Sequence, residues 1–413
     1  MSKYKTVFFP YVVWSVVLLL FSYQFIARSS FPTVLNEHFM EYFRLDTTGV
    51  GALASCYYWV YTFMQIPAGV IIDKMNVRVA AFLSAAFCAL GILLFASTTN
   101  CYVAGLGQMI LGFGSSFAFL LAIKVIASLF PAKKIPVMTS YTISVGVFGG
   151  PVIGGPILSY LIKDFSWVCI IKIFAFIGFV LALVIWLIIP NSKQIRKMDG
   201  HIFDSMKTIL ASRQVWVLAL YTTMLYAPLS ALGDLWGVSF IKKAYGVDSN
   251  VAAFANNMLY IGLVVGTPLL AHLAVLLDSY KKPMIIGVGG AAICMAIVLF
   301  GNLPLEVFFV LFFMLGCGCG AVLAYPLAVS LFPNSISAAV TGFVNMASMV
   351  SGVILMPLIG YIINMSWDGK MENGVKIYDL NDFRLGLIPV LVFLVLGVIL
   401  SFMVKDRSLK ESH

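Results

Sequence analysis

The sequence predicts an all-α membrane protein with twelve transmembrane helices in two pseudo-symmetric six-helix bundles. Three observations support this prediction: the composition, the length of the apolar runs, and a repeat with a period of half the chain. Of the 413 residues, 61% are hydrophobic and 10% are charged, whereas soluble domains carry about 25% charged residues. The composition therefore places most of the chain in a lipid bilayer.

The apolar runs have the length of membrane-crossing helices. A hydrocarbon core about 30 Å thick needs roughly 20 apolar residues per helix, and the continuous runs exclude the alternating strands of a β-barrel. The first run lacks a small-residue cleavage site, so we interpret it as a retained helix rather than a signal peptide. The expected spans are Val7–Leu35, Thr48–Ile72, Val77–Ala96, Cys101–Leu129, Val137–Leu161, Trp167–Ile189, Val215–Ile241, Val251–Leu277, Pro283–Phe300, Pro304–Leu331, Ser335–Ile363 and Leu385–Val404.

A long polar loop and the basic residues predict the division and the topology of the chain. The loop divides it into an N-terminal bundle, 1–189, a cytoplasmic linker, 190–214, and a C-terminal bundle, 215–413. Lys and Arg are concentrated in the segments on the side of the N-terminus, which predicts that both termini are cytoplasmic. We expect a monomer in a bacterial inner membrane, with the lipid bilayer and a small solute as its partners.

Three features recur at separations of 202 to 206 residues, which indicates a duplicated six-helix unit. They are an LG-x-G segment followed by a terminal LFP, an acidic residue in a short polar loop, and a P-x-I-G segment. The pairs are Leu111–Gly114 with Leu315–Gly318, Phe130–Pro131 with Phe332–Pro333, Asp73 with Asp278, and Pro151–Gly154 with Pro357–Gly360.

The short polar loop after the second span carries Gly69, Asp73, Lys74 and Arg78. These residues resemble the loop between the second and third helices of the major facilitator superfamily, whose pattern reads G-x-x-x-D-(R/K)-x-G-R-(R/K). The resemblance implies the major facilitator fold and transport by rocking two bundles about a central site. It also implies a gating role for Asp73, with Lys74 and Arg78 as its partners, and the same role for Asp278.

Arg28 and Lys124 are basic residues within predicted spans, where an ionisable residue is costly and points to function. The guanidinium of Arg28 matches a carboxylate or phosphate. Its surroundings resemble the first helix of organic-anion and organophosphate transporters of the superfamily, which implies contact with the anionic group of the substrate. Lys124 is a second candidate contact. The alternative for both is that the side chain extends to the headgroups.

Asp234 is an acid in the seventh span and our candidate for proton coupling, because a carboxylate in an apolar site can exchange a proton near neutral pH. A structural ion pair with a base is the alternative role. Tyr221, Tyr226 and Trp236 surround Asp234 in the sequence. They are candidate substrate-binding residues, with simple packing as the alternative.

The fifth span contains a pattern of small residues and proline: Gly150, Pro151, Gly154 and Gly155. Small residues allow close helix packing and proline can act as a hinge. The pattern resembles the fifth-helix signature of drug–proton antiporters of the superfamily, which favours export. Gln108 stands where those antiporters carry Arg, and the first span lacks their acid, so import and export both remain open.

The sequence contains no G-x-x-x-x-G-K-(S/T) loop and no metal-ligand or nucleophile pattern, so we expect that the protein is not an enzyme and binds no cofactor or metal. Its basic residues lie in short separated loops rather than on one face, so we expect no nucleic-acid partner. The seven cysteines have the placement of packing residues. We predict a secondary transporter for proton-coupled uptake of a small polar or anionic solute, such as an amino acid or carboxylate. YYWVYTFMQIPAG and FPAKK resemble nutrient transporters of intracellular bacteria. The alternatives are a proton-driven exporter of drugs or siderophores, and a receptor or scaffold that transports nothing.

Overall fold

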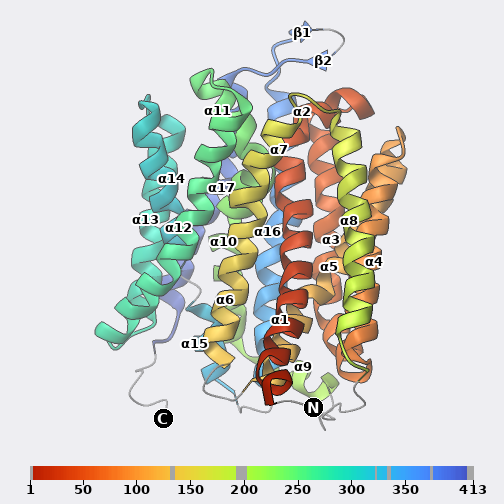
Figure 1. The fold of residues 1–413 in the computed structure, drawn as a ribbon. Helices are drawn as coiled ribbons and strands as arrows, with labels where there is room; N and C mark the ends of the chain where they lie inside the picture. The colour runs from red at the N-terminus through yellow and green to blue at the C-terminus, as the bar shows by residue number, and fades with distance from the viewer. Residues whose placement is uncertain are drawn as a thin grey trace. The chain divides into compact units, whose positions relative to one another are not determined.

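The computed structural model describes residues 3–130, 135–191, 202–320, 323–332, 336–372 and 375–406, and helices dominate these ranges (Figure 1). The label η marks π-helical turns. The elements before the linker are α1 (Lys3–Phe25), η1 (Ile26–Ser30), α2 (Phe31–Phe43), α3 (Thr47–Lys74), α4 (Val77–Ala96), α5 (Cys101–Leu129), α6 (Ile135–Val147), η3 (Phe148–Gly154), α7 (Gly155–Leu161) and α8 (Trp167–Ile188).

The linker contains a helix of its own, α9 (Ile202–Ala211). The remaining elements are α10 (Arg213–Leu225), η4 (Leu229–Trp236), α11 (Gly237–Tyr245), α12 (Ser249–Leu276), α13 (Lys281–Phe300), α14 (Leu305–Cys319), α15 (Ala324–Ser330), α16 (Ser337–Met365), β1 (Met371–Glu372), β2 (Val375–Lys376) and α17 (Leu380–Met403).

The helices confirm the predicted all-α membrane fold. Eleven helical stretches among the described residues are long and apolar enough to cross a membrane. The predicted spans Val77–Ala96 and Cys101–Leu129 coincide with α4 and α5 residue for residue. Helix α3 covers the predicted span Thr48–Ile72 but is not among the eleven. Its tyrosines, Thr62 and Gln65 lower its hydropathy, and several of them face a buried cation described below.

Three predicted spans are interrupted by π-helical turns that lie next to a proline. Pro32 follows η1, Pro151 lies within η3, and Pro228 precedes η4. Proline has no N–H for the α-helical hydrogen bond, and a π turn is a common way to absorb such a break. The first span therefore continues beyond the predicted Leu35 to Phe43 rather than ending at Pro32.

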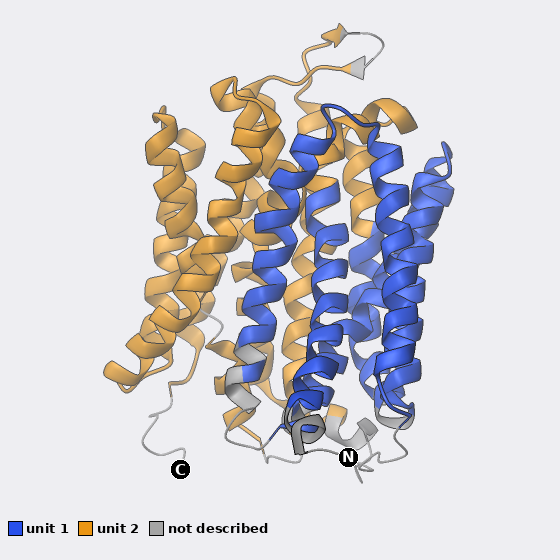
Figure 2. Cartoon of the chain, in the orientation of Figure 1, with its two compact units in different colours: residues 1–31, 56–198 blue, residues 32–55, 199–413 orange. Residues whose placement is uncertain are grey.

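The chain forms two compact units, which are coloured separately in Figure 2. Unit 1 comprises Met1–Phe31 and Cys56–Met198, and unit 2 comprises Pro32–Ser55 and Asp199–His413. The C-terminal part of the first span thus belongs to unit 2, and the change of unit falls between Phe31 and Pro32, one residue after η1. The predicted bundles 1–189 and 215–413 describe the sequence repeat, and that division stays a prediction.

Glycines allow the closest helix contacts within each unit. In unit 1, a Cβ atom at Gly91 of α4 would lie 2.5 Å from the Gly107 carbonyl oxygen of α5. In unit 2, a Cβ at Gly262 of α12 would lie 2.0 Å from the Phe313 carbonyl oxygen of α14. Any side chain at these positions would force the backbones apart, so the van der Waals packing that holds membrane helices together depends on these glycines.

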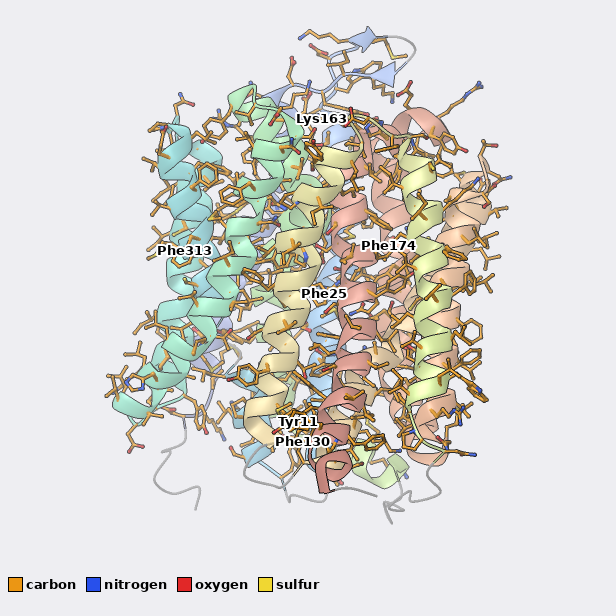
Figure 3. The ribbon with its side chains drawn as sticks, in the orientation of Figure 1. Tyr11, Phe25, Phe130, Lys163, Phe174 and Phe313 are labelled. Atoms are coloured by element: carbon orange, nitrogen blue, oxygen red, sulfur yellow. The ribbon has the colours of Figure 1, made fainter. Side chains whose placement is uncertain are left out.

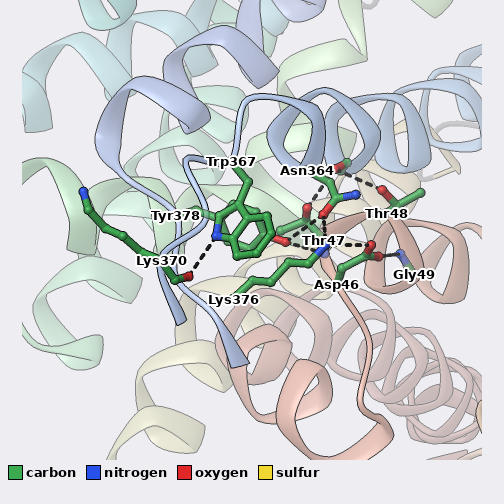
Figure 4. A network of polar contacts seen from close by, with 10 residues as sticks. Asp46, Thr47, Thr48, Gly49, Asn364, Trp367, Lys370, Lys376 and Tyr378 are labelled. Carbon is green, nitrogen blue, oxygen red and sulfur yellow. Dashed lines mark hydrogen bonds and ion pairs between the residues drawn. The ribbon is translucent and has the colours of Figure 1, made fainter. Parts of the chain in front are cut away.

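A β-hairpin that the sequence analysis did not predict connects α16 and α17 within unit 2 (Figure 4). Lys376 donates to Asn364 Oδ1 at 2.8 Å and its Nζ lies 3.7 Å from Asp46. Tyr378 also donates to Asn364, at 3.2 Å. These contacts attach the loop before α3 to the end of α16. Nearby, hydrogen bonds to Asp368 and Asp379 raise the pKa of the Lys370 ammonium.

Candidate functional site

Arg28 is a buried cation in unit 1. It lies on η1, and the side chain is 4% exposed. The guanidinium carbon lies 4.1 Å from the ring centroid of Phe25 and 5.9 Å from that of Tyr58. Phe25 is the last residue of α1, and Figure 3 labels it partway along the continuous helical stretch Phe8–Phe43, away from the ends of that stretch. The side chain is therefore enclosed by protein, and cation–π contacts with two rings offset part of the cost of burying it.

Polar groups of α1 and α3 lie beside this cation, and Tyr57 and Tyr61 are close enough to interact with its charge. The Tyr57 hydroxyl donates to Gln24 Oε1 at 3.2 Å. The Tyr57 and Tyr61 rings stack, with their centroids 5.5 Å apart. Gln65 continues the same face of α3, because residues four apart share a face. The four-residue spacing of Tyr57, Tyr61 and Gln65 is the signal in the sequence that could have identified this face.

The glycine–proline pattern of the fifth span packs against the turn that carries Arg28. Ser30 donates to the Gly150 carbonyl oxygen at 3.3 Å. A Cβ atom at Gly150 would lie 2.9 Å from Phe25 Cβ, and one at Gly154 would lie 3.1 Å from Ser30 Oγ. Pro151 is buried within η3, and Gly155 begins α7. The pattern thus fixes the position of η1, while its role as a hinge stays a prediction.

We expect Gly150→Ala to impair the site and Gly149→Ala to leave it intact. The new methyl group at residue 150 meets Phe25 next to its backbone, so the ring beneath Arg28 must move. At residue 149 the methyl group would be 3.6 Å from its nearest neighbour, Ser22 Oγ. Overpacking of this kind costs about 1–3 kcal/mol. Thermal unfolding of both purified variants measures the difference, and equal midpoints would contradict the described packing.

Asp234 is a buried acid in unit 2. It lies on η4 and is 0% exposed. The Tyr260 hydroxyl of α12 donates to Asp234 Oδ1. The neighbouring carbonyl of Gly233 accepts from Thr33 Oγ1 at 2.8 Å and from Asn256 Nδ2 at 3.2 Å. The acid stands out in the sequence, but its partners do not, because they lie on two other elements, α2 and α12.

Arg28 and Asp234 occupy equivalent positions of the sequence repeat. They are 206 residues apart, which is also the separation of Pro151 and Pro357. Each lies on a π-helical turn, and such turns occur frequently at functional sites. The duplicated chain has thus placed a base at one position and an acid at the other. The equivalence was visible in the residue numbers, but the π turns were not.

Two of the three predicted substrate-binding aromatics donate hydrogen bonds to protein groups in unit 2. Tyr221 is 0% exposed and its hydroxyl donates to the Met284 carbonyl oxygen at 3.1 Å. Trp236 is 1% exposed and its Nε1 donates to the Met356 carbonyl oxygen at 3.4 Å. Tyr226 is half-buried directly after α10. The geometry gives Tyr221 and Trp236 a packing role, and substrate binding by the three stays a prediction.

Lys124 lies on α5 and its ammonium donates to the Ile72 carbonyl oxygen, near the C-terminal end of α3. A cation is favourable there because the helix dipole places negative partial charge at that end. The side chains of Asp73 and Lys74 lie outside the described residues. The geometry therefore gives Lys124 a structural contact in unit 1, and substrate binding by Lys124 stays a prediction.

Arg78 packs its guanidinium over the Trp186 ring, 4.3 Å from the centroid. Asn76, which stands where the superfamily pattern has glycine, caps α4: its Oδ1 accepts from the Arg78 N–H at 2.8 Å. Its Nδ2 donates to Asn191 Oδ1 at 2.6 Å. This departure from the pattern thus supplies the first turn of α4 with a hydrogen-bond acceptor.

Asp278 lies in the turn between α12 and α13 with a left-handed φ of 45°. The carboxylate that accepts hydrogen bonds from the backbone at the start of α13 belongs to Asp406, beyond the end of α17. Asp406 Oδ1 accepts from the N–H groups of Tyr280 and Lys281, both at 3.1 Å. Ser279 Oγ lies 2.5 Å from Asp406 Oδ2. This contact attaches the end of α17 to the loop that contains Asp278.

We expect Asp406→Ala to destabilise unit 2 by about 1–2 kcal/mol, because it removes an acceptor from the N-terminus of α13. The exposed neighbour Lys405 provides a control, since replacing it with alanine leaves this cap in place. Thermal unfolding in detergent measures both variants. Equal stability of the two would show that the contact contributes nothing.

Comparison with known proteins places the fold among transporters. A family model described as Major Facilitator Superfamily matches residues 16–238 and 235–412. The uncharacterized transporter YybO of Bacillus subtilis is 22% identical over 353 residues, which are 78% of this chain and 81% of that protein. The probable galactarate/D-glucarate transporter GarP of Escherichia coli K12 is 22% identical over 404 residues, which are 88% of this chain and 90% of that protein.

Solved structures show the same fold. A bacterial homolog of the human lysosomal transporter Spinster, inward-facing and unoccupied, has a TM-score of 0.77 at 17% identity and covers 96% of this chain and 97% of its own. A D-xylose-proton symporter has a TM-score of 0.72 at 16% identity, with 97% of each chain covered. These likenesses concern the arrangement of helices alone.

Proposed function

Because the chain belongs to the major facilitator superfamily and is a multi-pass membrane transport protein, we propose that it takes up a small organic anion whose carboxylate binds Arg28. The protein is a secondary transporter and not an enzyme, and alternating access is the mechanism that the superfamily implies. The inner membrane, cytoplasmic termini and a monomeric state are part of the proposal. So is gating by Asp73, Lys74, Arg78 and Asp278.

The observation that carries this proposal is the burial of Arg28. A guanidinium remains charged in the protein interior and presents a planar fork of donors that fits a carboxylate. Burying the charged Arg28 to 4% exposure within a membrane-spanning segment costs free energy. Ionisable residues at such positions are typical of substrate pathways. The rings of Phe25 and Tyr58 leave the guanidinium edge as the part that can form hydrogen bonds.

The neighbouring polar groups favour an anion that also carries hydroxyl groups. Tyr57, Tyr61, Gln24 and Gln65 offer hydroxyl and amide groups beside the cation, and these can donate to or accept from substrate hydroxyls. Two relatives are named as probable galactarate/D-glucarate transporters. We therefore propose a sugar acid or a related hydroxycarboxylate as the solute, with amino acids as the next class to test.

Asp234 is the proposed proton-coupling group. The acid is fully buried and bound to Tyr260, so gain and loss of a proton would change a hydrogen bond inside unit 2. A likeness in fold to a D-xylose-proton symporter is compatible with this role. Proton coupling would allow the membrane potential and the pH gradient to drive accumulation of an anion against its own gradient.

Uptake into proteoliposomes tests the proposal. Labelled D-glucarate, galactarate and a panel of amino acids and small carboxylates would be supplied with and without an inward proton gradient. We expect gradient-stimulated uptake of at least one hydroxycarboxylate. If no member of the panel enters and a hydrophobic cation moves outward against the gradient, the uptake proposal is wrong.

A proton-driven exporter of drugs or siderophores is the second candidate, favoured by the glycine–proline pattern of the fifth span. The contacts of Gly150 and Gly154 with η1 give these glycines a packing role that does not depend on export. A strain that lacks an exporter should become sensitive to toxic compounds, whereas a strain that lacks an importer should need another nutrient. A non-transporting scaffold predicts neither phenotype.

A further inference from the structure

The C-terminal part of the first span is hydrogen-bonded to the backbone of the turn that carries Asp234. Thr33 Oγ1 donates to the Gly233 carbonyl oxygen at 2.8 Å, and Asn36 Nδ2 donates to the Leu235 carbonyl oxygen at 3.2 Å. These two carbonyls belong to the residues immediately before and after Asp234. All of these residues lie in unit 2.

Both carbonyls are on a π-helical turn, which explains why side chains bind them. A π turn replaces the regular α-helical hydrogen bonds, and in the hydrocarbon region backbone groups must find partners within the protein. Thr33 and Asn256 share the Gly233 carbonyl, and Asn36 takes that of Leu235. Two helices, α2 and α12, therefore complete the hydrogen bonding of the Asp234 turn.

The same face of α2 makes a further contact within unit 2. Ser239 donates to Asn36 Oδ1 at 3.0 Å, so the side-chain amide of Asn36 forms hydrogen bonds through both its oxygen and its nitrogen. Beyond the end of α2, Thr47 Oγ1 donates to the Gly360 carbonyl oxygen at 2.8 Å, within the network of Figure 4. The segment that starts directly after η1 and Arg28 is thus attached at two places, and only the first involves the Asp234 turn.

We propose that Thr33 and Asn36 are coupling residues, which link the protonation state of Asp234 to the attachment of α2. The carboxylate is an acceptor and takes a hydrogen bond from Tyr260. A proton on Asp234 adds an O–H donor within the turn. This donor competes with Thr33 and Asn36 for the carbonyls of the turn and so weakens the attachment of α2. The inference rests on the proposed proton-coupling role of Asp234.

Other titratable groups lie near the proposed link and must be separated from Asp234. On α2, Glu37 and His38 are exposed, and Lys242 of α11 binds Glu37 at 2.6 Å. On α12, Tyr260 is the partner of Asp234. Helix α16 meets η4 through Ser351, which does not titrate in this range and lies 3.1 Å from Ser230.

Hydrogen–deuterium exchange of the protein in lipid nanodiscs tests the link without any solute. Exchange in residues 31–43 and 229–240 would be compared at about pH 5.5 and pH 7.5, after correction for intrinsic rates. We expect exchange in both segments to rise together at the lower pH in the wild type. Asp234→Asn should remove this response from both segments, since His38 and Glu37 are unchanged in that variant.

Thr33→Val removes one cross-helix donor at almost constant volume, so exchange in residues 31–43 should rise about fivefold at the higher pH, as for one lost hydrogen bond. Asn36→Leu removes the second donor, with a similar expected increase. Thr33→Ser keeps the hydroxyl and should behave as the wild type. Thr267→Val is the matched control, because Thr267 donates to Leu263 of its own helix at 2.8 Å.

Two results would overturn the inference. One is a pH response that persists in Asp234→Asn, which would assign it to His38 or Glu37. The other is a Thr33→Val variant that exchanges in residues 31–43 no faster than Thr267→Val. Failure of D-glucarate uptake would contradict the proposed solute alone, because the exchange measurement involves no transport.

Discussion

Replacing Arg28 with alanine is expected to lower the specific rate of D-glucarate uptake by at least about 100-fold. A charged hydrogen-bonding pair in a buried site is lost, and removing one partner of such a pair costs about 2–5 kcal/mol. Arg28→Lys keeps the charge without the planar fork and should give an intermediate rate. Initial rates over a range of solute concentrations separate the loss of binding from slower translocation.

Arg384 provides the matched control for that experiment. It lies near the start of α17 and donates to Asn302 Oδ1 at 3.1 Å, away from η1 in the sequence and in a different unit. Arg384→Ala should retain uptake within a few-fold of the wild type. If Arg28→Ala transports D-glucarate as well as Arg384→Ala does, Arg28 has no part in binding the solute.

Replacing Asp234 with asparagine is expected to abolish proton-driven accumulation while solute exchange continues. Asparagine keeps the shape of the side chain but cannot take up a proton, so the proton gradient can no longer drive transport through this residue. Accumulation should fall to the equilibrium level, a loss of about tenfold or more at a gradient of one pH unit. Accumulation under an imposed gradient and counterflow without one measure the two activities in the same vesicles.

Asp248 is the control for the acid-to-amide change. Its side chain caps α12 by accepting from the Val251 N–H at 2.9 Å, and asparagine caps helices about as well as aspartate. Asp248→Asn should therefore accumulate solute normally. An Asp234→Asn variant that still responds to the gradient would remove Asp234 from proton coupling, even if Arg28 is confirmed as the solute contact.

Most of the helical architecture could be predicted because each span is a local property of the chain. The ends of α4 and α5 match the predicted ends, and both helices start after an asparagine that caps them, Asn76 and Asn100. The π turns could not be predicted in the same way. Each of them depends on the helices that pack against a proline-containing segment, and hydrophobic periodicity carries no information about such partners.

The charged residues of the candidate site were predicted from the sequence, whereas the residues that contact them were not. Arg28 and Asp234 stand out because few ionisable residues lie within apolar runs. Tyr260 and Thr33 are 26 and 201 residues from Asp234 along the chain, so only the fold shows that they bind its turn. Tyr221 and Trp236, which are near Asp234 in the sequence, donate to backbone carbonyls of other helices. Closeness in the sequence was a poor guide to closeness in the interior.

The most direct test of the central claim compares a charged solute with its neutral counterpart at Arg28. Inhibition of D-glucarate uptake by unlabelled D-glucarate and by D-glucitol, which lacks the carboxylates, would be measured in the wild type and in Arg28→Lys. The account predicts that the wild type prefers D-glucarate by about 100-fold or more, and that the preference shrinks in the variant. Equal discrimination in both proteins would contradict the claim that Arg28 binds the carboxylate.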